Sequence, residues 1–100
     1  MIDIPDEVTI SAITAEVQRI RARLPDSRWF FFGSITTSKR PVRDIDLLVV
    51  CETTDDCTMI RNAFGSICAR FPVHLLLMNP REEVEVKFIQ NERAVEIALD

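Results

Sequence analysis

The stretch FFGS at residues 31–34 is followed, after nine residues, by DIDLLVV at residues 44–50. The first piece ends an aromatic run, Arg28–Phe32, whose composition and flanking turn residues favour a buried strand. The second piece begins the most apolar run of the chain, over which we also expect a strand. Gly33 lets the backbone approach a ligand closely after the first strand, and Ser34 with the amides that follow it can cradle phosphate oxygens.

Asp44 and Asp46 begin the second strand. Side chains alternate along a strand, so the two carboxylates share one face, about 6.6 Å apart along the chain. Ile45 and Leu47 then point the other way and pack. Two neighbouring carboxylates repel each other unless a positive charge lies between them. A magnesium ion is the simplest such charge, because it takes oxygen ligands and commonly holds substrate phosphates as well.

Each piece alone has a simpler interpretation. An Asp-x-Asp on a strand is often only an exposed polar face, and a Gly-Ser after a strand is often only a turn. The two pieces together, at this spacing, resemble the signature of the nucleotidyltransferase superfamily, which includes DNA polymerase beta and the minimal nucleotidyltransferases. The resemblance implies a nucleotidyltransferase fold, with Gly33 and Ser34 on the β- and γ-phosphates of a nucleoside triphosphate and with Asp44 and Asp46 holding Mg²⁺ or Mn²⁺.

The reaction that the resemblance implies is in-line attack of an acceptor hydroxyl on the α-phosphorus, with loss of pyrophosphate. ATP is the expected nucleotide. Lys39, Arg40 and Arg43 lie within five positions and are expected to be further nucleotide-binding residues, although basic loop residues are often only solvated. The net charge of −4 and the pI near 5.0 argue against broad binding of duplex nucleic acid, which needs a basic face.

Active members of the superfamily usually carry a third carboxylate on a later, adjacent strand. The matching strand here is VHLLLM, residues 73–78, and its corresponding position is His74. Three interpretations of His74 stay open: a half-buried histidine without function, a general base in place of the carboxylate, or a metal ligand. We therefore expect an enzyme with Asp44, Asp46 and His74 as catalytic residues, and keep as the alternative a catalytically impaired module that binds a nucleotide or a protein.

The resemblance also implies a partner. Minimal nucleotidyltransferases often work beside a helical HEPN-type protein, as antitoxin to its toxin. Residues 1–100 are expected to form one domain, with no second domain to select an acceptor. The acceptor is therefore expected to come from a protein partner or from a second copy of the chain.

The other segments complete an α+β expectation: a small mixed sheet of about three or four strands, flanked by helices. We expect helices over 6–23 and from 53–56 to about 69, and strands over 28–32, 44–51 and 73–78. A further helix should begin at Asn79, with Glu82 as its capping-box partner. A helical stripe continues to Val95, although Val84, Val86 and Phe88 also alternate as they would in a strand. The expected order is α-β-β-α-β-α.

Location and redox state follow from composition. No apolar stretch approaches the ~20 residues of a membrane span, and MIDIPDEVTI lacks the features of a signal peptide, so a cytoplasmic location is expected. Cys51, Cys57 and Cys68 are odd in number and lack a CxxC spacing. They are expected to be reduced and structural.

Overall fold

The computed structural model describes residues 7–33 and 45–97. The described residues form helices α1 (Glu7–Arg23), α3 (Thr54–Arg70), α4 (Pro80–Val86) and α5 (Phe88–Asn91), and strands β1 (Arg28–Phe32), β2 (Ile45–Val50), β3 (Val73–Met78) and β4 (Val95–Glu96). The α+β class is confirmed. The expected helix over 6–23 and the expected strands over 28–32 and 73–78 are present, and the expected strand over 44–51 is described from Ile45.

The four strands form one mixed sheet in the order β3-β2-β1-β4. Strand β1 is antiparallel to both β2 and β4, whereas β2 and β3 are parallel. The parallel pair requires a crossover connection, which α3 provides between the two strands. Strand β3 therefore lies directly beside β2 in the sheet.

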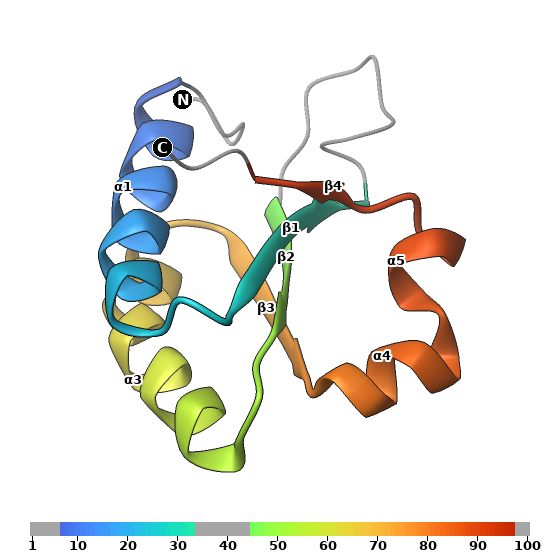
Figure 1. Ribbon diagram of the computed structural model, residues 1–100. Coiled ribbons are helices and arrows are strands. Elements are labelled where there is room, and N and C mark those ends of the chain that lie inside the picture. Colours follow the sequence, from blue (N-terminus) through green and yellow to red (C-terminus); the bar gives the residue numbers. More distant parts are fainter. Residues whose placement is uncertain (1–6, 34–44, 98–100) are drawn as a thin grey trace.

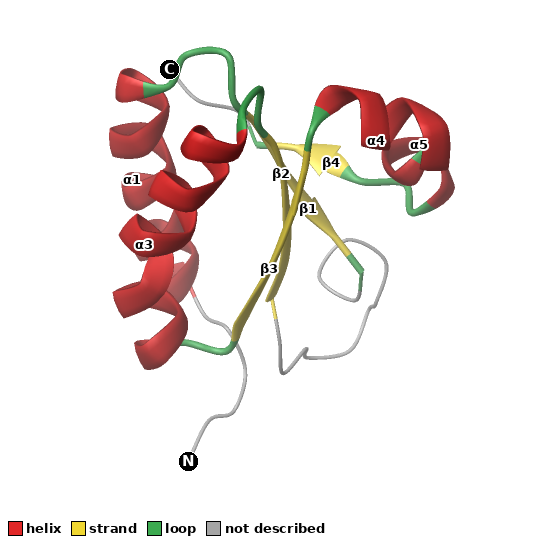
Figure 2. Cartoon of the chain, turned by 90° about the horizontal axis from the view of Figure 1, so that it is seen from below, coloured by secondary structure: helices red, strands yellow, loops and turns green. Residues whose placement is uncertain are grey.

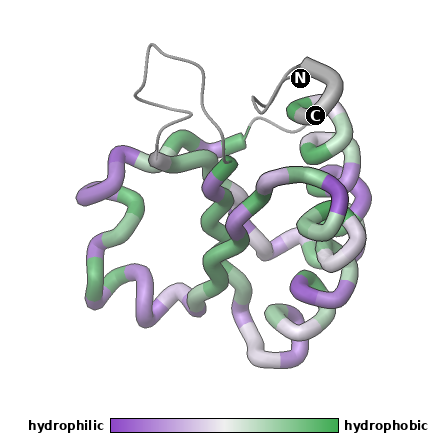
Figure 3. The backbone as a smooth tube through the Cα atoms, turned by 180° about the vertical axis from the view of Figure 1, so that it is seen from behind, coloured by the Kyte–Doolittle hydropathy of each residue, from purple (hydrophilic) through white to green (hydrophobic). Residues whose placement is uncertain are grey.

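Helices α1 and α3 cover one face of the sheet, and α4 and α5 lie on the other side (Figures 1 and 2). The first face carries Ile45, Leu47 and Val49 of β2, each 0% exposed, in one cluster with residues of α1 and α3 such as Val17 and Phe64. In Figure 3 the hydrophobic residues follow the strands through the middle of the molecule. Alternation along β2 thus fixes which side chains are buried against the helices.

The second face is only partly covered. Phe30, Leu48 and Val50 form a smaller buried cluster, with Phe88 and Ile89 packed against it. Helices α4 and α5 lie over the end of this face at which β3 ends (Figure 2). Asp46 lies toward the other end of the same face.

The chain after Asn79 begins as expected and then departs from expectation. Asn79 Oδ1 accepts a hydrogen bond from the Glu82 amide at 2.7 Å, and Glu82 Oε1 accepts one from the Asn79 amide at 3.0 Å, which confirms the capping box. The helix ends at Val86, because Lys87 adopts a left-handed conformation with φ 53°. Separate segments, α5 and then β4, follow it.

The expected helical continuation toward Val95 is therefore wrong, and a fourth strand takes its place. Val95 pairs with Phe31, and Glu96 with Phe30, along the open edge of β1. Backbone groups at a sheet edge need hydrogen-bond partners, so tertiary pairing decides between two local patterns that the sequence leaves nearly equal.

The expectation of three reduced cysteines is also wrong. Cys51 and Cys57 form a disulfide with their Cα atoms 5.9 Å apart, while Cys68 is free and exposed. The physical reason is the turn between β2 and α3. Thr53 caps α3, its Oγ1 accepting a hydrogen bond from the Asp56 amide at 3.0 Å, and this turn brings the first turn of the helix back to Cys51.

None of the described helices is both long enough and apolar enough to cross a membrane.

Partial burial raises the pKa of the Cys68 thiol above its ordinary value, so less of the reactive thiolate forms at neutral pH.

We expect Cys57→Ser to lower the free energy of unfolding by about 2 kcal/mol, because a crosslink across even a short loop restricts the unfolded chain. Urea unfolding of the two proteins, each with and without a reducing agent, measures the effect. The difference should largely disappear under reducing conditions. A difference of the same size in reducing buffer would show that it comes from packing and not from the crosslink.

Candidate functional site

The predicted site residues divide into two groups. Gly33, Asp46 and His74 belong to the part of the chain that the structure describes. The remaining predicted site residues lie outside the described residues: Ser34, Lys39, Arg40, Arg43 and Asp44. The geometry of the candidate site is thus that of the first three residues.

Gly33 follows β1 directly and lies against the carboxylate of Asp46. Its φ is +75°, a conformation that residues with a Cβ adopt only with strain. A Cβ added at Gly33 would collide with Oδ2 of Asp46 and would lie 3.4 Å from its Cγ. The backbone conformation therefore favours glycine at this position, and a Cβ there would displace the Asp46 carboxylate.

Asp46 lies on β2, in register with Phe32 of β1. It points to the partly covered face of the sheet, because Ile45 and Leu47 on either side of it are buried in the opposite cluster. Its side chain is 25% exposed. The predicted packing of Ile45 and Leu47 away from the carboxylate is confirmed.

His74 is the register partner of Asp46 on β3. His74 Nδ1 lies 3.4 Å from Asp46 Oδ1, and the imidazole is 69% exposed. This separation is longer than that of a formed hydrogen bond, so the attraction is electrostatic and strongest when the imidazole is protonated. His74 is exposed, so the half-buried position that one interpretation assigned to it is wrong.

The two oxygens of Asp46 therefore face two different neighbours. Oδ1 faces the imidazole of His74, and Oδ2 faces the backbone of Gly33. A carboxylate beside Nδ1 favours the histidine tautomer that carries its proton there, and Nε2 then has the lone pair that can accept a proton. Gly33 follows the end of β1, and Asp46 and His74 lie near the starts of β2 and β3, so the three residues lie together at one end of the sheet. We call these three residues the Asp46 row.

The fit to a divalent cation depends on the donor types present. Over residues 7–33 and 45–97, no three His, Cys, Asp or Glu side chains lie close enough to hold a metal ion together. Asp46 offers the oxygen ligands that Mg²⁺ takes, whereas the nitrogen of His74 suits Mn²⁺ or Zn²⁺ better. A magnesium site at Asp46 would need a further oxygen ligand, for which the sequence offers the other carboxylate of the DID motif.

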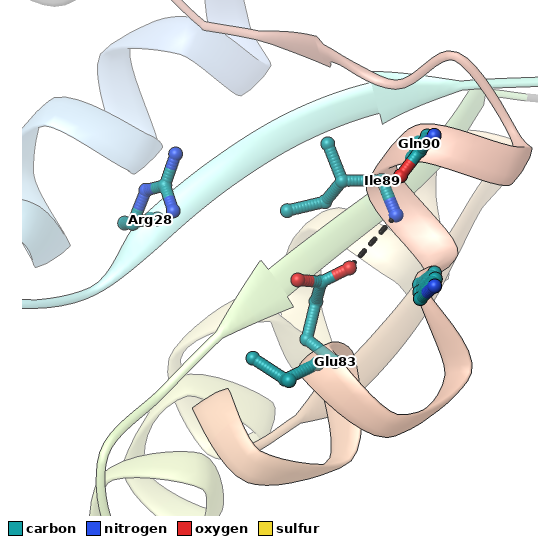
Figure 4. A pocket seen from close by; sticks show the side chains of 6 residues that line it. Arg28, Glu83, Ile89 and Gln90 are labelled. Carbon is teal, nitrogen blue, oxygen red and sulfur yellow. Dashed lines mark hydrogen bonds between the residues drawn. The ribbon is translucent and has the colours of Figure 1, made fainter.

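A pocket of about 430 Å³ lies farther along the same face, between β1 and the α4–α5 segment (Figure 4). Arg28 lines it from β1, and Lys87 and Gln90 line it from the other side. Glu83 stabilises that side, because its carboxylate accepts a hydrogen bond from the Ile89 amide at 3.0 Å. Arg28 begins the strand that Phe32 ends, so Arg28 and the register partner of Asp46 lie about 14 Å apart along β1.

This pocket could not be predicted from the sequence, because its residues come from separate elements and share no motif. The bond between Cys51 and Cys57 was not predicted either. The Thr-Thr-Asp-Asp capping signal between the two cysteines was visible in the sequence, and it was the one feature that placed them at a tight turn.

No protein-family model matches this chain, and a search of curated proteins found no match.

Gly33→Ala should lower the free energy of unfolding by about 1–2 kcal/mol from its left-handed conformation alone, and should displace the Asp46 carboxylate as well. Gly65→Ala is the matched control. Gly65 lies inside α3, and a Cβ there would meet nothing within 4 Å, so this variant should gain up to about 1 kcal/mol. Urea unfolding of both variants tests the pair, and equal effects would contradict the assigned geometry.

Proposed function

We propose that this chain is a nucleotidyltransferase-fold domain that binds a nucleoside triphosphate, ATP in the first instance, and transfers its nucleoside monophosphate to an acceptor hydroxyl. The observation that carries the proposal is the contact between Gly33 and Asp46. The two halves of the FFGS and DID pattern are separated in the sequence, and this contact makes them neighbours in space. The antiparallel register of β1 and β2 thus sets the glycine and the carboxylate side by side, where a phosphate group and its cation could be held together.

Phosphate binding follows from the backbone at Gly33. Because glycine has no Cβ, a phosphate group could approach the backbone of this turn closely, and Ser34 would add a hydroxyl. Asp46, with Asp44, would hold Mg²⁺ or Mn²⁺, which supplies positive charge against the triphosphate. Lys39, Arg40 and Arg43 would contribute further charge from the connecting segment.

His74 is the residue that we assign to proton transfer. Asp46 orients the imidazole through Nδ1, and Nε2 accepts the proton of the acceptor hydroxyl as its oxygen attacks the α-phosphorus. The new phosphorus–oxygen bond forms as the bond to pyrophosphate breaks. The 3.4 Å gap between His74 and Asp46 is compatible with this role, because catalytic hydrogen bonds often shorten only when the substrate binds.

The acceptor would approach along the partly covered face of the sheet. The pocket between Arg28 and Lys87 is on that face and offers cationic and amide groups to part of an acceptor. We infer that the acceptor belongs to a protein partner, such as a HEPN-type protein, or to a second copy of the chain. We place the reaction in the cytoplasm, where nucleoside triphosphates are abundant.

One observation favours a second function. His74 lies beside Asp46 on β3, the strand on which the resemblance to the superfamily would lead us to expect a third carboxylate. Without that carboxylate, the domain could bind a nucleotide or a protein without transferring anything. The alternative is therefore a binding module with the same phosphate site and no turnover.

Asp46→Asn should weaken binding of ATP with magnesium at least about tenfold, because it removes the charge that compensates the cation. Isothermal titration calorimetry measures this. Asp26→Asn is the matched control: it makes the same charge change in the turn before β1, at the opposite end of that strand from Gly33, and should leave the affinity unchanged. An equal loss in both variants would point to net charge and not to this site.

His74→Ala should lower kcat for transfer by roughly 10²–10⁴-fold, the usual contribution of a general base, and leave KM for ATP nearly unchanged. Transfer of label from α-³²P-ATP measures both constants. Leu76→Ala, at the next position on the same side of β3, serves as the control. An unchanged kcat in His74→Ala would refute the base assignment, and nucleotide binding without any transfer by the wild type would support the binding module.

A further inference from the structure

The two sulfurs of the disulfide differ in their access to solvent. Cys51 is 1% exposed and belongs to the main hydrophobic cluster. Cys57 is half-buried, and it lines a pocket of about 330 Å³ together with Thr53, Arg61 and Asn79. An external thiol can therefore reach Cys57 through this pocket, while Cys51 is shielded.

The pocket lies at the end of the sheet opposite the Asp46 row. It is lined by residues from the end of β3 and from the first turns of α3 and α4, at the carboxyl ends of the two parallel strands. The disulfide joins the residue after β2 to the first turn of α3. Any chemistry at this bond is thus separate from the proposed nucleotide site.

A reduced Cys51 would have a hydrogen-bond partner within the fold. Its sulfur lies 3.8 Å from the carbonyl oxygen of Met78, which a thiol at that position can use as a hydrogen-bond acceptor. The start of α3 also has its own support: Thr53 Oγ1 accepts from the Asp56 amide at 3.0 Å, and the carbonyl of Thr53 accepts from the Cys57 amide at 3.0 Å. The turn therefore keeps its hydrogen bonds without the crosslink.

We propose that the Cys51–Cys57 bond is a reversible thiol–disulfide exchange site at which an external dithiol attacks the sulfur of Cys57. The attacking thiolate forms a mixed disulfide with Cys57, and the bond to Cys51 breaks, so that Cys51 leaves as a thiolate and takes up a proton. The second thiol of the dithiol then displaces Cys57. The protein disulfide is reduced to two thiols as the dithiol is oxidised to its own disulfide, and the oxidised dithiol reverses the reaction.

The first test counts thiols in the full chain. The purified protein is equilibrated in mixtures of reduced and oxidised dithiothreitol, its free thiols are alkylated, and the products are separated by intact mass. The proposal predicts two forms, one alkylated only at Cys68 and one at all three cysteines, with the same far-UV circular dichroism spectrum. Three free thiols under every oxidising mixture, or loss of helix in step with reduction, would overturn it.

The second test asks whether reduction occurs in the folded state. The rate of reduction by dithiothreitol is measured at several urea concentrations below the unfolding transition. If the thiol enters through the pocket beside Cys57, the rate stays constant across these concentrations. A rate that rises with urea in parallel with the unfolding equilibrium would show that the bond is reached only by unfolding, and the proposal would fail.

The third test assigns the attacked sulfur. Cys51→Ser and Cys57→Ser, each combined with Cys68→Ser, leave one thiol per chain, and alkylation of each follows the accessibility of that thiol. Cys57 should react at least about tenfold faster than Cys51, because a buried thiol is inert. Circular dichroism verifies folding, and Cys51→Ala replaces the serine variant if that variant does not fold. Equal rates, or a faster Cys51, would contradict attack at Cys57.

Discussion

The pairing of β1 with β2, in the register that places Phe32 opposite Asp46, is the constraint on which the site depends. A slip of one residue would move every side chain of β2 to the other face of the sheet. The carboxylate of Asp46 would then enter the cluster under α1 and α3, and Ile45 and Leu47 would be exposed. Burial of those apolar side chains thus fixes the register, and the register in turn brings Asp46 against Gly33.

The unequal covering of the two faces gives the site its access. Helices α1 and α3 bury one face of the sheet, whereas α4 and α5 bury only one end of the other (Figure 2). Phe88 marks the boundary, since its ring packs edge-to-face on Phe32 with the ring centroids 4.9 Å apart. Beyond this contact, Asp46 and His74 keep exposed surface. The same strands thus supply a dry core and a row of polar groups that a ligand can reach.

Much of the fold could be predicted because its signals are local. The aromatic run before Gly33, the apolar strand from Ile45 and the capping box at Asn79 each determine their own segment, and the structure confirms all three. Strand β4 could not be predicted in the same way. Its two residues pair with β1 only after left-handed turns at Lys87 and at Arg93, and neither of these residue types signals such a turn in the sequence.

The candidate site shows the same division. The prediction that Asp46 points away from the core follows from strand alternation alone, whereas its contact with His74 depends on the parallel pairing of β2 and β3 through a helix of seventeen residues. The disulfide was not predicted, because the rules for cysteine spacing cover only known motifs such as CxxC, and these two cysteines belong to none. The pairing of Cys51 with Cys57 depends instead on how tightly one turn folds around Thr53.

The central claim is that Gly33, Asp46 and His74 mark a site for a nucleoside triphosphate. The most direct measurement is an amide NMR titration of the wild-type protein with ATP and magnesium, repeated with Asp44→Asn. If these residues bind the nucleotide, the amide shifts are concentrated at Gly33, Ser34 and Asp46, with a smaller response at His74, and all of these shifts are lost in the variant. Absence of shifts at millimolar ATP, or shifts centred on the pocket beside Cys57, would contradict it.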